Sequence, residues 1–191
     1  MQMLRRSVDM VPLLAAVRYE QGFDINGILL QVVTRLRNES LVVGGVLQEV
    51  GTKGTECCDP LSVVDIRSGK TARIMEDRGR EARGCKLDAR GLADISHCVG
   101  DAIDAGVDLI VINRFGRAES EGGGLLYCFS DAVCAGIPVL TAVRPPYLES
   151  WRTFHGGLAT ELPPALNEIT AWYGASRRQA QLSKTGISSA W

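Results

Sequence analysis

The chain has 191 residues, of which 46% are hydrophobic and 23% are charged, a balance typical of one compact globular domain. With 21 Lys and Arg against 22 Asp and Glu, the formal net charge is −1, which disfavours a general nucleic-acid-binding surface. No apolar run approaches the ~20 residues of a membrane span, and Asp9 and Pro12 interrupt the stretch that follows Arg5 and Arg6. We therefore expect a cytoplasmic protein that binds neither nucleic acid nor membrane.

The cationic residues are mostly arginines, with 17 Arg and only 4 Lys. Guanidinium groups suit bidentate binding of oxyanions. Between residues 67 and 90 there are eight Lys and Arg and four Asp and Glu, which leaves a local net charge of +4. Charge runs are usually solvated faces, but so local an excess also fits an edge or lid that meets an anionic ligand.

Apolar runs and helical stripes alternate along the chain. Buried strands are predicted over 11–17, 41–47, 107–112 and 137–143. Helices are predicted over 24–38, 90–105, 124–135, 147–155 and 164–173. Two short segments, 61–66 and 71–75, flank Ser68-Gly69 and predict an antiparallel hairpin.

Continuous apolar strands separated by helices indicate a largely parallel sheet that is covered on both faces. The prediction is a three-layer α/β fold with an added antiparallel hairpin. It places a single domain at 11–173, an N-terminal extension at 1–10 and a flexible polar tail at 174–191. Ligands in such folds bind beyond the carboxyl ends of the strands, so the loops after residues 17, 112 and 143 are the candidate ligand loops.

The loop after the first strand has the glycine spacing of a phosphate-binding loop. Gly22 and Gly27 match the two glycines of G-x-x-x-x-G-K-[ST], but Ile28 and Leu29 replace the lysine and the hydroxyl residue. In a working phosphate loop, the lysine binds the phosphates and the hydroxyl residue binds Mg²⁺. The alternative is a turn glycine followed by a glycine inside the helix.

The loop after the strand at 107–112 begins with Asn113 and Arg114, where a nucleotide hydrolase would carry acids that hold Mg²⁺ and activate water. The sequence therefore argues against magnesium-dependent hydrolysis by the usual means, and no catalytic residue is predicted. Arg114 and Arg117, with the glycines at 122–124, predict an anion cradle. The alternative is a solvated loop whose arginines pair with Glu119 and Glu121.

The cysteines contain no C-x-x-C pair, and the two histidines, His97 and His155, are far apart in sequence. No metal site is predicted, because a structural zinc site needs two ligand pairs at defined spacings. The cysteines are therefore expected to be free thiols, with Cys128 and Cys134 buried on a helix face. The six are Cys57, Cys58, Cys85, Cys98, Cys128 and Cys134.

An ordered set of motifs over about residues 11–173 resembles a bacterial family of unknown function that is commonly encoded beside molybdate-transport genes. Its members are similar to this chain in several short segments. These are Tyr19–Gly22, Val43–Gly45, Cys58-Asp59, Ala82–Asp88, Asn113–Glu119, Gly136–Val143 and Trp151–Ala159.

This family is in turn distantly similar to small nucleoside triphosphatases with a phosphate-loop fold. Their Asp-Glu-x-Gly-x-x-Glu signature aligns with Asn113–Glu119, which keeps Gly116 and Glu119 but replaces both leading acids. The resemblance implies a mostly parallel sheet of the phosphate-loop NTPase type. The residues at Asn113 and Arg114 do not support the triphosphatase activity of those proteins.

The function that these observations favour is non-hydrolytic binding of an anion or nucleotide on a degenerate phosphate-loop fold. The ligand implied by the family's gene neighbourhood is molybdate or tungstate, with a nucleotide bound without Mg²⁺ as the other option. One alternative is an unorthodox NTPase that uses Glu20 or Glu119. The other is a regulatory adaptor acting through the hairpin and the segment around Trp151 and Phe154, although these aromatics fit core packing better. The predicted ligand-binding residues are Gln21, Gly22, Asp24, Arg83, Asn113, Arg114, Gly116, Arg117 and Glu119.

Overall fold

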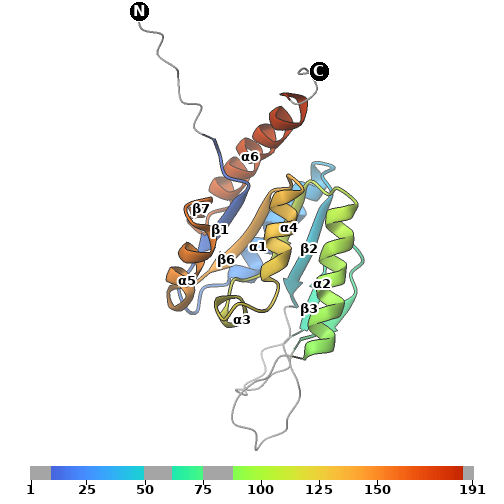
Figure 1. Ribbon diagram of the computed structural model, residues 1–191, viewed down its shortest axis with the longest axis vertical. Helices are drawn as coiled ribbons and strands as arrows, with labels where there is room; N and C mark the ends of the chain where they lie inside the picture. The colour runs from blue at the N-terminus through green and yellow to red at the C-terminus, as the bar shows by residue number, and fades with distance from the viewer. Residues whose placement is uncertain (1–9, 50–61, 75–87, 187–191) are drawn as a thin grey trace, which may run out of the picture.

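The computed structural model describes residues 10–49, 62–74 and 88–186, with side chains as far as residue 182. Within these residues, seven strands form one sheet in the order β4-β3-β2-β5-β6-β1-β7 (Figure 1). The strands are β1 (Leu14–Arg18), β2 (Val43–Gln48), β3 (Ser62–Asp65), β4 (Thr71–Arg73), β5 (Leu109–Ile112), β6 (Val139–Val143) and β7 (Ala159–Leu162).

The sheet is parallel except at one edge, where β2 pairs antiparallel with β3 and β3 pairs antiparallel with β4. The predicted hairpin is therefore confirmed. Helices cover both faces of the sheet, which confirms the three-layer α/β fold. They are α1 (Ile25–Asn38), α2 (Ala89–Asp104), α3 (Arg117–Ser120), α4 (Leu126–Cys134), α5 (Pro145–His155) and α6 (Leu166–Gly186).

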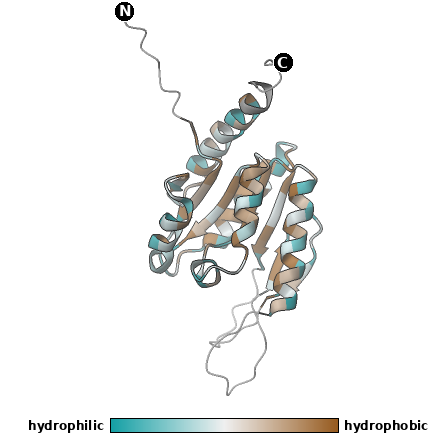
Figure 2. Cartoon of the chain, viewed as in Figure 1, coloured by the Kyte–Doolittle hydropathy of each residue, from teal (hydrophilic) through white to brown (hydrophobic). Residues whose placement is uncertain are grey.

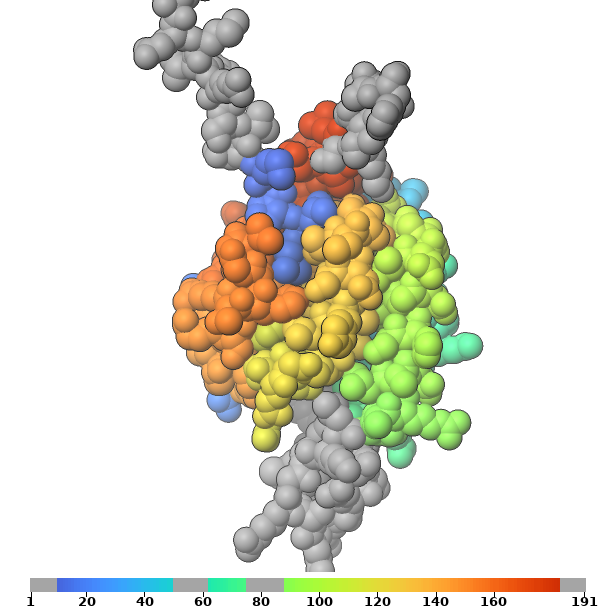
Figure 3. All heavy atoms as spheres, viewed as in Figure 1, coloured from blue at the N-terminus to red at the C-terminus, as the bar shows by residue number. Residues whose placement is uncertain are grey.

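Alternate residues of each central strand enter two separate cores, as the period of a strand requires. One core packs Ala15, Val17, Val111 and other strand residues against α1 and α6. The other core packs the opposite strand faces against α2, α4 and α5. Figure 2 shows the hydrophobic strands between the mixed helices, and Figure 3 shows α2, α4 and α5 covering the sheet face towards the viewer.

The helix ends follow local sequence rules. Asp24 and Asp88 are the N-caps of α1 and α2, and each side chain accepts a hydrogen bond from a backbone N–H in the first turn. Gly106 and Gly136, both with φ near +70°, follow α2 and α4. These glycines end the helices where the sequence predicted, because a positive φ is strained for residues with a Cβ.

The middle of β2 carries a glycine because its neighbour is close. A Cβ at Gly45, whose φ is +100°, would collide with the backbone oxygen of Val111 on the adjacent strand. At Gly44, a Cβ would lie only 2.6 Å from the Cβ of Ala102, so α2 packs directly on the strand backbone.

An aromatic cluster fills the core beneath α5. Trp151, Phe115 and Phe129 are fully buried, and their ring centroids lie 5.2 to 6.2 Å apart in edge-on arrangements. Phe154 contacts all three rings. Among the described residues, this segment is core packing, as the sequence favoured, rather than an exposed contact surface.

Four features differ from what the sequence predicted. The sequence missed β7, which pairs with β1 at the sheet edge, and the short helix α3. The helix expected to end near 173 continues to residue 186, where a flexible tail was predicted, and Ser176 on it is buried and donates to the Pro12 oxygen. Cys134 is exposed, although Cys128 is buried as predicted.

No helix in the described part of the chain is long and apolar enough to cross a bilayer.

Candidate functional site

The three candidate ligand loops follow the carboxyl ends of β1, β5 and β6. They therefore lie together on the side of the sheet where its parallel strands end, the carboxyl edge. Strand β6 lies between β1 and β5, so the loops after β1 and β5 do not follow neighbouring strands. Both nevertheless bond to β6, because Tyr19 N–H donates to the Val143 oxygen and Phe115 N–H donates to the Ala142 oxygen. The loops after β1 and β5 therefore flank the end of the same strand.

The turn after β1 is not built as a phosphate loop. Gly22 has a φ of +89° and forms the turn, in which Phe23 N–H donates to the Glu20 oxygen. Helix α1 begins at Ile25, so Gly27 lies inside its first turn. This is the alternative that the sequence left open, a turn glycine followed by a helix glycine. Gln21 is exposed on the same turn.

The carboxylate of Asp24 occupies the N-terminus of α1. Its Oδ1 accepts the Gly27 N–H at 3.0 Å. A Cβ at Gly27 would collide with Asp24 Oδ2, so the glycine makes room for the acid. Because a phosphate at a helix N-terminus uses the same amides, Asp24 both takes a donor and adds a repelling negative charge there.

The loop after β5 is tied to α1 by one asparagine. Asn26 Oδ1 accepts from Arg114 Nη2 at 3.1 Å and from Asn113 Nδ2 at 3.3 Å. Because arginine only donates, the side-chain oxygen of Asn26 must face Arg114. The same oxygen then accepts from Asn113, so Asn113 turns its amide nitrogen towards Asn26. Asn113 is buried, and its Oδ1 is left with no hydrogen-bond partner among the described residues.

Arg114 is exposed but held in place. Besides its bond to Asn26, its guanidinium carbon lies 5.8 Å from the centroid of the Tyr19 ring. A cation over an aromatic face is stabilised by the ring quadrupole. Residues from the turn after β1 and from the start of α1 therefore position the first arginine after β5.

Glu119 organises the rest of the loop after β5. Its Oε2 accepts the Gly116 N–H at 2.9 Å and its Oε1 accepts the Leu125 N–H at 3.1 Å. A Cβ at Gly124 would collide with Glu119 Oε1, so the glycine-rich stretch encloses this carboxylate. Of the glycine amides that the sequence suggested for an external anion, those of Gly122 and Gly123 donate to the backbone oxygens of Glu119 and Ala118.

Arg117 follows the alternative predicted for it. Its Nε lies 2.8 Å from Glu121 Oε1, in an exposed i,i+4 ion pair on α3. The hydrogen bond to Glu121 raises the pKa of Arg117. The structure thus brings Arg114 to α1 while Arg117 is paired locally.

Two further arginines end neighbouring strands at this edge. Arg144 directly follows β6, and its guanidinium lies 5.4 Å from the centroid of the Tyr147 ring. Arg18 ends β1 and lies 3.3 Å from Glu161 on β7. Glu161 also bonds to Arg152, and this hydrogen bond lowers the pKa of its carboxyl group.

Sequence reasoning missed three residues of this edge. Asn26, Tyr19 and Arg144 position or extend the cationic group. Tyr19 begins the motif Tyr19–Gly22 but was given no role in binding, and the other two belong to no named family motif. A usable signal existed for Arg144, because it is the first residue of a loop already chosen as a candidate ligand loop. Asn26 had no such signal, since its contacts depend on how α1 meets β5.

Several predicted residues lie outside the part of the chain that the structure describes, namely Arg83, Cys57, Cys58 and Cys85. Within residues 10–49, 62–74 and 88–182, no three His, Cys, Asp or Glu side chains are grouped to hold a metal ion.

Comparison with known protein families identifies the family of this chain. A family described as a protein of unknown function, DUF2478, matches residues 14–172. The chain belongs to the DUF2478 family. The resemblance to a bacterial family of unknown function, predicted from its ordered motifs, is thereby confirmed.

A curated relative of this DUF2478 chain is the molybdenum import ATP-binding protein ModC 2 of Bradyrhizobium diazoefficiens. The two are 38% identical over 159 residues. The match covers 83% of this chain but only 18% of ModC 2. The DUF2478 chain therefore corresponds to a small part of that relative.

The solution structure of a human cancer-related nucleoside triphosphatase superposes on the chain with a TM-score of 0.58 and 13% sequence identity. The superposition covers 93% of this chain and 99% of the triphosphatase. At this identity the likeness shows the fold alone. It confirms a fold of the phosphate-loop NTPase type for this DUF2478 chain.

Proposed function

We propose that this chain binds a small oxyanion, or the phosphate of a nucleotide, at the carboxyl edge of the sheet without hydrolysing nucleoside triphosphates. The observation that carries the proposal is the preorganised guanidinium of Arg114, held by Asn26 Oδ1 and the Tyr19 ring. That hydrogen bond uses one of the five N–H donors of a guanidinium. A fixed, exposed fork is suited to bidentate binding of an oxyanion.

Arg144 supports the proposal from the neighbouring strand. Phe115 N–H donates to the Ala142 oxygen, which places Arg114 beside the last residues of β6, Ala142 and Val143. Arg144 is the next residue, and adjacent strands are about 4.8 Å apart. Two long guanidinium side chains therefore start from one small area of the edge, where α/β sheets bind their ligands.

The bonds of Asp24 and Glu119 argue against nucleotide hydrolysis. Asp24 takes the amide of α1 that a phosphate would need, and both oxygens of Glu119 accept backbone N–H groups. A carboxylate held in this way is poorly placed to act as a general base, which must reach the proton it removes. Asn113 supplies an uncharged amide where a hydrolase would bind Mg²⁺ through a carboxylate.

The proposed oxyanion is molybdate or tungstate. The support is the similarity to ModC 2, a molybdenum import ATP-binding protein that contains a segment similar to this chain. We propose that the segment acts there as an accessory domain that responds to the imported anion. The similar segment is only 18% of ModC 2, so the proposal assigns neither the transport nor the ATP-binding function of the whole protein to this chain.

A nucleotide is the second candidate, and a pocket favours it. A hollow of about 350 Å³ adjoins Asn26 and lies between α1 and the strands β2 and β3. Its walls include Leu30, Val33, Leu47 and Val64. This volume is within the range of small-molecule sites, so an apolar body bound here would lie beside the residue that holds Arg114.

Calorimetric titration with molybdate, tungstate, phosphate, ADP and ATP tests the proposal. Replacing Arg114 by Ala removes a charge-assisted hydrogen bond worth about 1.5–3 kcal/mol, so the affinity for the preferred ligand should fall roughly 10- to 150-fold. Arg67→Ala is the matched control, because Arg67 is an exposed arginine whose guanidinium bonds to the Asp101 oxygen at the C-terminal end of α2. Equal affinities in the wild type, Arg114→Ala and Arg67→Ala would contradict the proposal.

A further inference from the structure

The hollow that adjoins Asn26 is a groove between α1 and the added hairpin, here called the α1–β3 groove. Helix α1 packs over β2, whereas β3 extends the sheet past this helix. Val64 of β3 lies opposite Leu47 of β2 in the antiparallel register, so both side chains are on the α1 face of the sheet. Leu47 is buried, but Val64 is only half-buried. The groove, of about 350 Å³, lies between these strands and the flank of α1.

The residues that α1 contributes to the groove form one stripe. They are spaced by four, three and four positions, so they lie on one face of the helix. They are Asn26, Leu30, Val33 and Arg37. Leu30 is 48% exposed although it is large and apolar, and a body bound in the groove would remove its surface from water. The helix rises about 16 Å from Asn26 to Arg37, so these two residues lie at opposite ends of the groove.

Arg37 forms the end of the groove that lies away from the carboxyl edge. Its guanidinium donates to the backbone oxygen of Ile66, which follows β3 and also lines the groove. This bond orients the guanidinium and uses one of its five N–H donors. Among the described residues, no carboxylate forms an ion pair with Arg37. The groove therefore ends on an oriented cation that is not neutralised by a partner in the described part of the chain.

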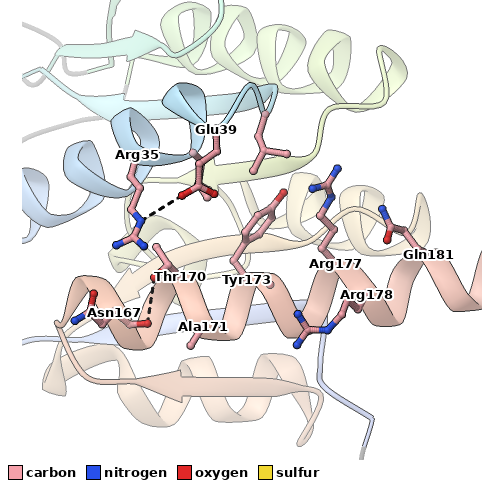
Figure 4. A pocket seen from close by; sticks show the side chains of 12 residues that line it. Arg35, Glu39, Asn167, Thr170, Ala171, Tyr173, Arg177, Arg178 and Gln181 are labelled. Atoms are coloured by element: carbon pink, nitrogen blue, oxygen red, sulfur yellow. Dashed lines mark hydrogen bonds and ion pairs between the residues drawn. The ribbon is translucent and has the colours of Figure 1, made fainter.

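The opposite flank of α1, which faces α6, carries a neutralised arginine instead. Figure 4 shows Arg35 paired with Glu39, and the distance between the two groups is 3.4 Å. Arg35 and Arg37 are two positions apart on the helix, so their side chains start about 200° apart around its axis. Arg35 is therefore a matched control for Arg37, on the same helix but outside the α1–β3 groove.

Two acids also line the groove, but neither neutralises Arg37. Glu49 follows β2 at the carboxyl edge, near the end of the groove that holds Asn26. Asp65 lies opposite Val46, whose side chain belongs to the core on the α2 face of the sheet. Burial, and after it the charge of Asp65, raises the pKa of the Cys98 thiol on α2, which agrees with a carboxylate on that face. The negative charges therefore lie at the far end of the groove and on the other side of the sheet.

We propose that the α1–β3 groove binds a small organic anion, whose carboxylate or phosphate group bonds to Arg37 while its apolar body packs between Leu30 and Val64. The unneutralised guanidinium supplies the charge complementarity, and the volume is within the range of small-molecule sites. The inference goes beyond the function proposed at the carboxyl edge and does not depend on it. A carboxylate and a phosphate supply the same acceptor oxygens, and the test distinguishes them.

Amide-resolved NMR titration of the whole chain tests the groove with four probes. Benzoate and phenyl phosphate carry the two oxyanion types on one apolar ring, whereas inorganic phosphate carries an anion alone and benzyl alcohol the ring alone. We expect at least one of the two aryl anions to shift the amides of Val64 and Gly69, which line the groove. It should bind at least about tenfold more tightly than inorganic phosphate or benzyl alcohol, because apolar burial and the bond to Arg37 both contribute.

Two variants on α1 test the named contacts. Arg37→Ala should weaken the preferred probe about 10-fold or more, because it removes a charge-assisted hydrogen bond. Leu30→Ala should weaken it about 3- to 10-fold, because it removes apolar surface that the ring covers. Leu30 is half exposed, so this second variant keeps the test valid if Arg37→Ala fails to fold. Arg35→Ala and Arg114→Ala should leave the affinity unchanged.

The outcomes separate this site from the carboxyl edge. Affinity that falls in Arg114→Ala would overturn the independent site and support the nucleotide candidate, in which the groove holds only the apolar body. Equal affinities in wild type, Arg37→Ala and Leu30→Ala would overturn the proposal, and so would equal losses in Arg35→Ala and Arg37→Ala. Aryl anions that bind no more tightly than inorganic phosphate and benzyl alcohol would also overturn it. Absence of any amide shift at millimolar concentrations of all four probes would do the same.

Discussion

The turns after β1 and β5 occupy equivalent places in the sheet, yet their acids do different work. Asp24 accepts one N–H, three residues ahead in the helix that it caps. Glu119 accepts two, from Gly116 and Leu125, and so connects the start of α3 to the start of α4. In both turns a carboxylate of the chain bonds to backbone amides, and at α1 the bonded amide is one that a phosphate loop would present to a ligand. The fold is retained, while its amides stabilise the protein instead.

The largest effect is expected from Glu119→Ala. It leaves the Gly116 and Leu125 amides without their charged acceptor, and each such bond is worth about 1.5–3 kcal/mol. Allowing for water reaching part of the site, we expect a loss of about 2–4 kcal/mol in the free energy of unfolding, measured by urea titration. Glu121→Ala, which breaks only the exposed pair with Arg117, is the control and should cost less than about 1 kcal/mol. Equal losses in the two variants would show that the bonds of Glu119 have no special weight.

Asp24→Asn tests the acid in the turn after β1. Asparagine caps helices as well as aspartate does, so stability should change little. Removing the negative charge should make the N-terminus of α1 more attractive to phosphate by about 0.3–1 kcal/mol, or up to about fivefold in affinity. Calorimetry with ATP in wild type and variant measures this, and an unchanged or weaker affinity would mean that Asp24 does not oppose phosphate there.

A third carboxylate, Glu161, gives the smallest effect because it binds surface arginines rather than amides. Its pKa is lowered, chiefly by the hydrogen bond from Arg152, so the folded state binds its proton less readily than the unfolded state. Its contribution is therefore full above about 4.5, the ordinary value for glutamate, and is lost as the pH falls through the lowered folded-state pKa.

Glu161→Gln should therefore be less stable than the wild type near neutral pH by at most about 1 kcal/mol, and the difference should shrink in acid. Thermal melting of both proteins across this range checks it. Arg152 and Arg18 are partly exposed, which keeps the effect small. A difference that grows as the pH falls would have the wrong sign.

Local signals in the sequence predicted most of the fold. Gly106 and Gly136 ended helices where expected, because a positive φ is a property of the glycine itself. Strand β7 was missed because it is a short, half-buried edge strand without a continuous apolar run. The length of α6 was missed because its last turns carry no apolar stripe, although Ser176 is buried.

The candidate site was predictable only where its chemistry is local. The acid at Asp24 carried an N-cap signal that favours a helix starting at the next residue, and the glycine spacing obscured it. The contact between Asn26 and Arg114 joins residues 88 positions apart, so it follows from the packing of α1 against the sheet. No spacing within either loop predicts it.

The most direct test is magnesium-dependent release of phosphate from ATP and GTP by the purified protein. The account predicts a rate no higher than background, because Ile28, Leu29 and Asn113 replace the groups that bind phosphate and Mg²⁺, and the amides of the two turns are bonded to Asp24 and Glu119. Release above background that requires Mg²⁺ and disappears in Glu20→Gln or Glu119→Gln would contradict it and identify an unorthodox triphosphatase.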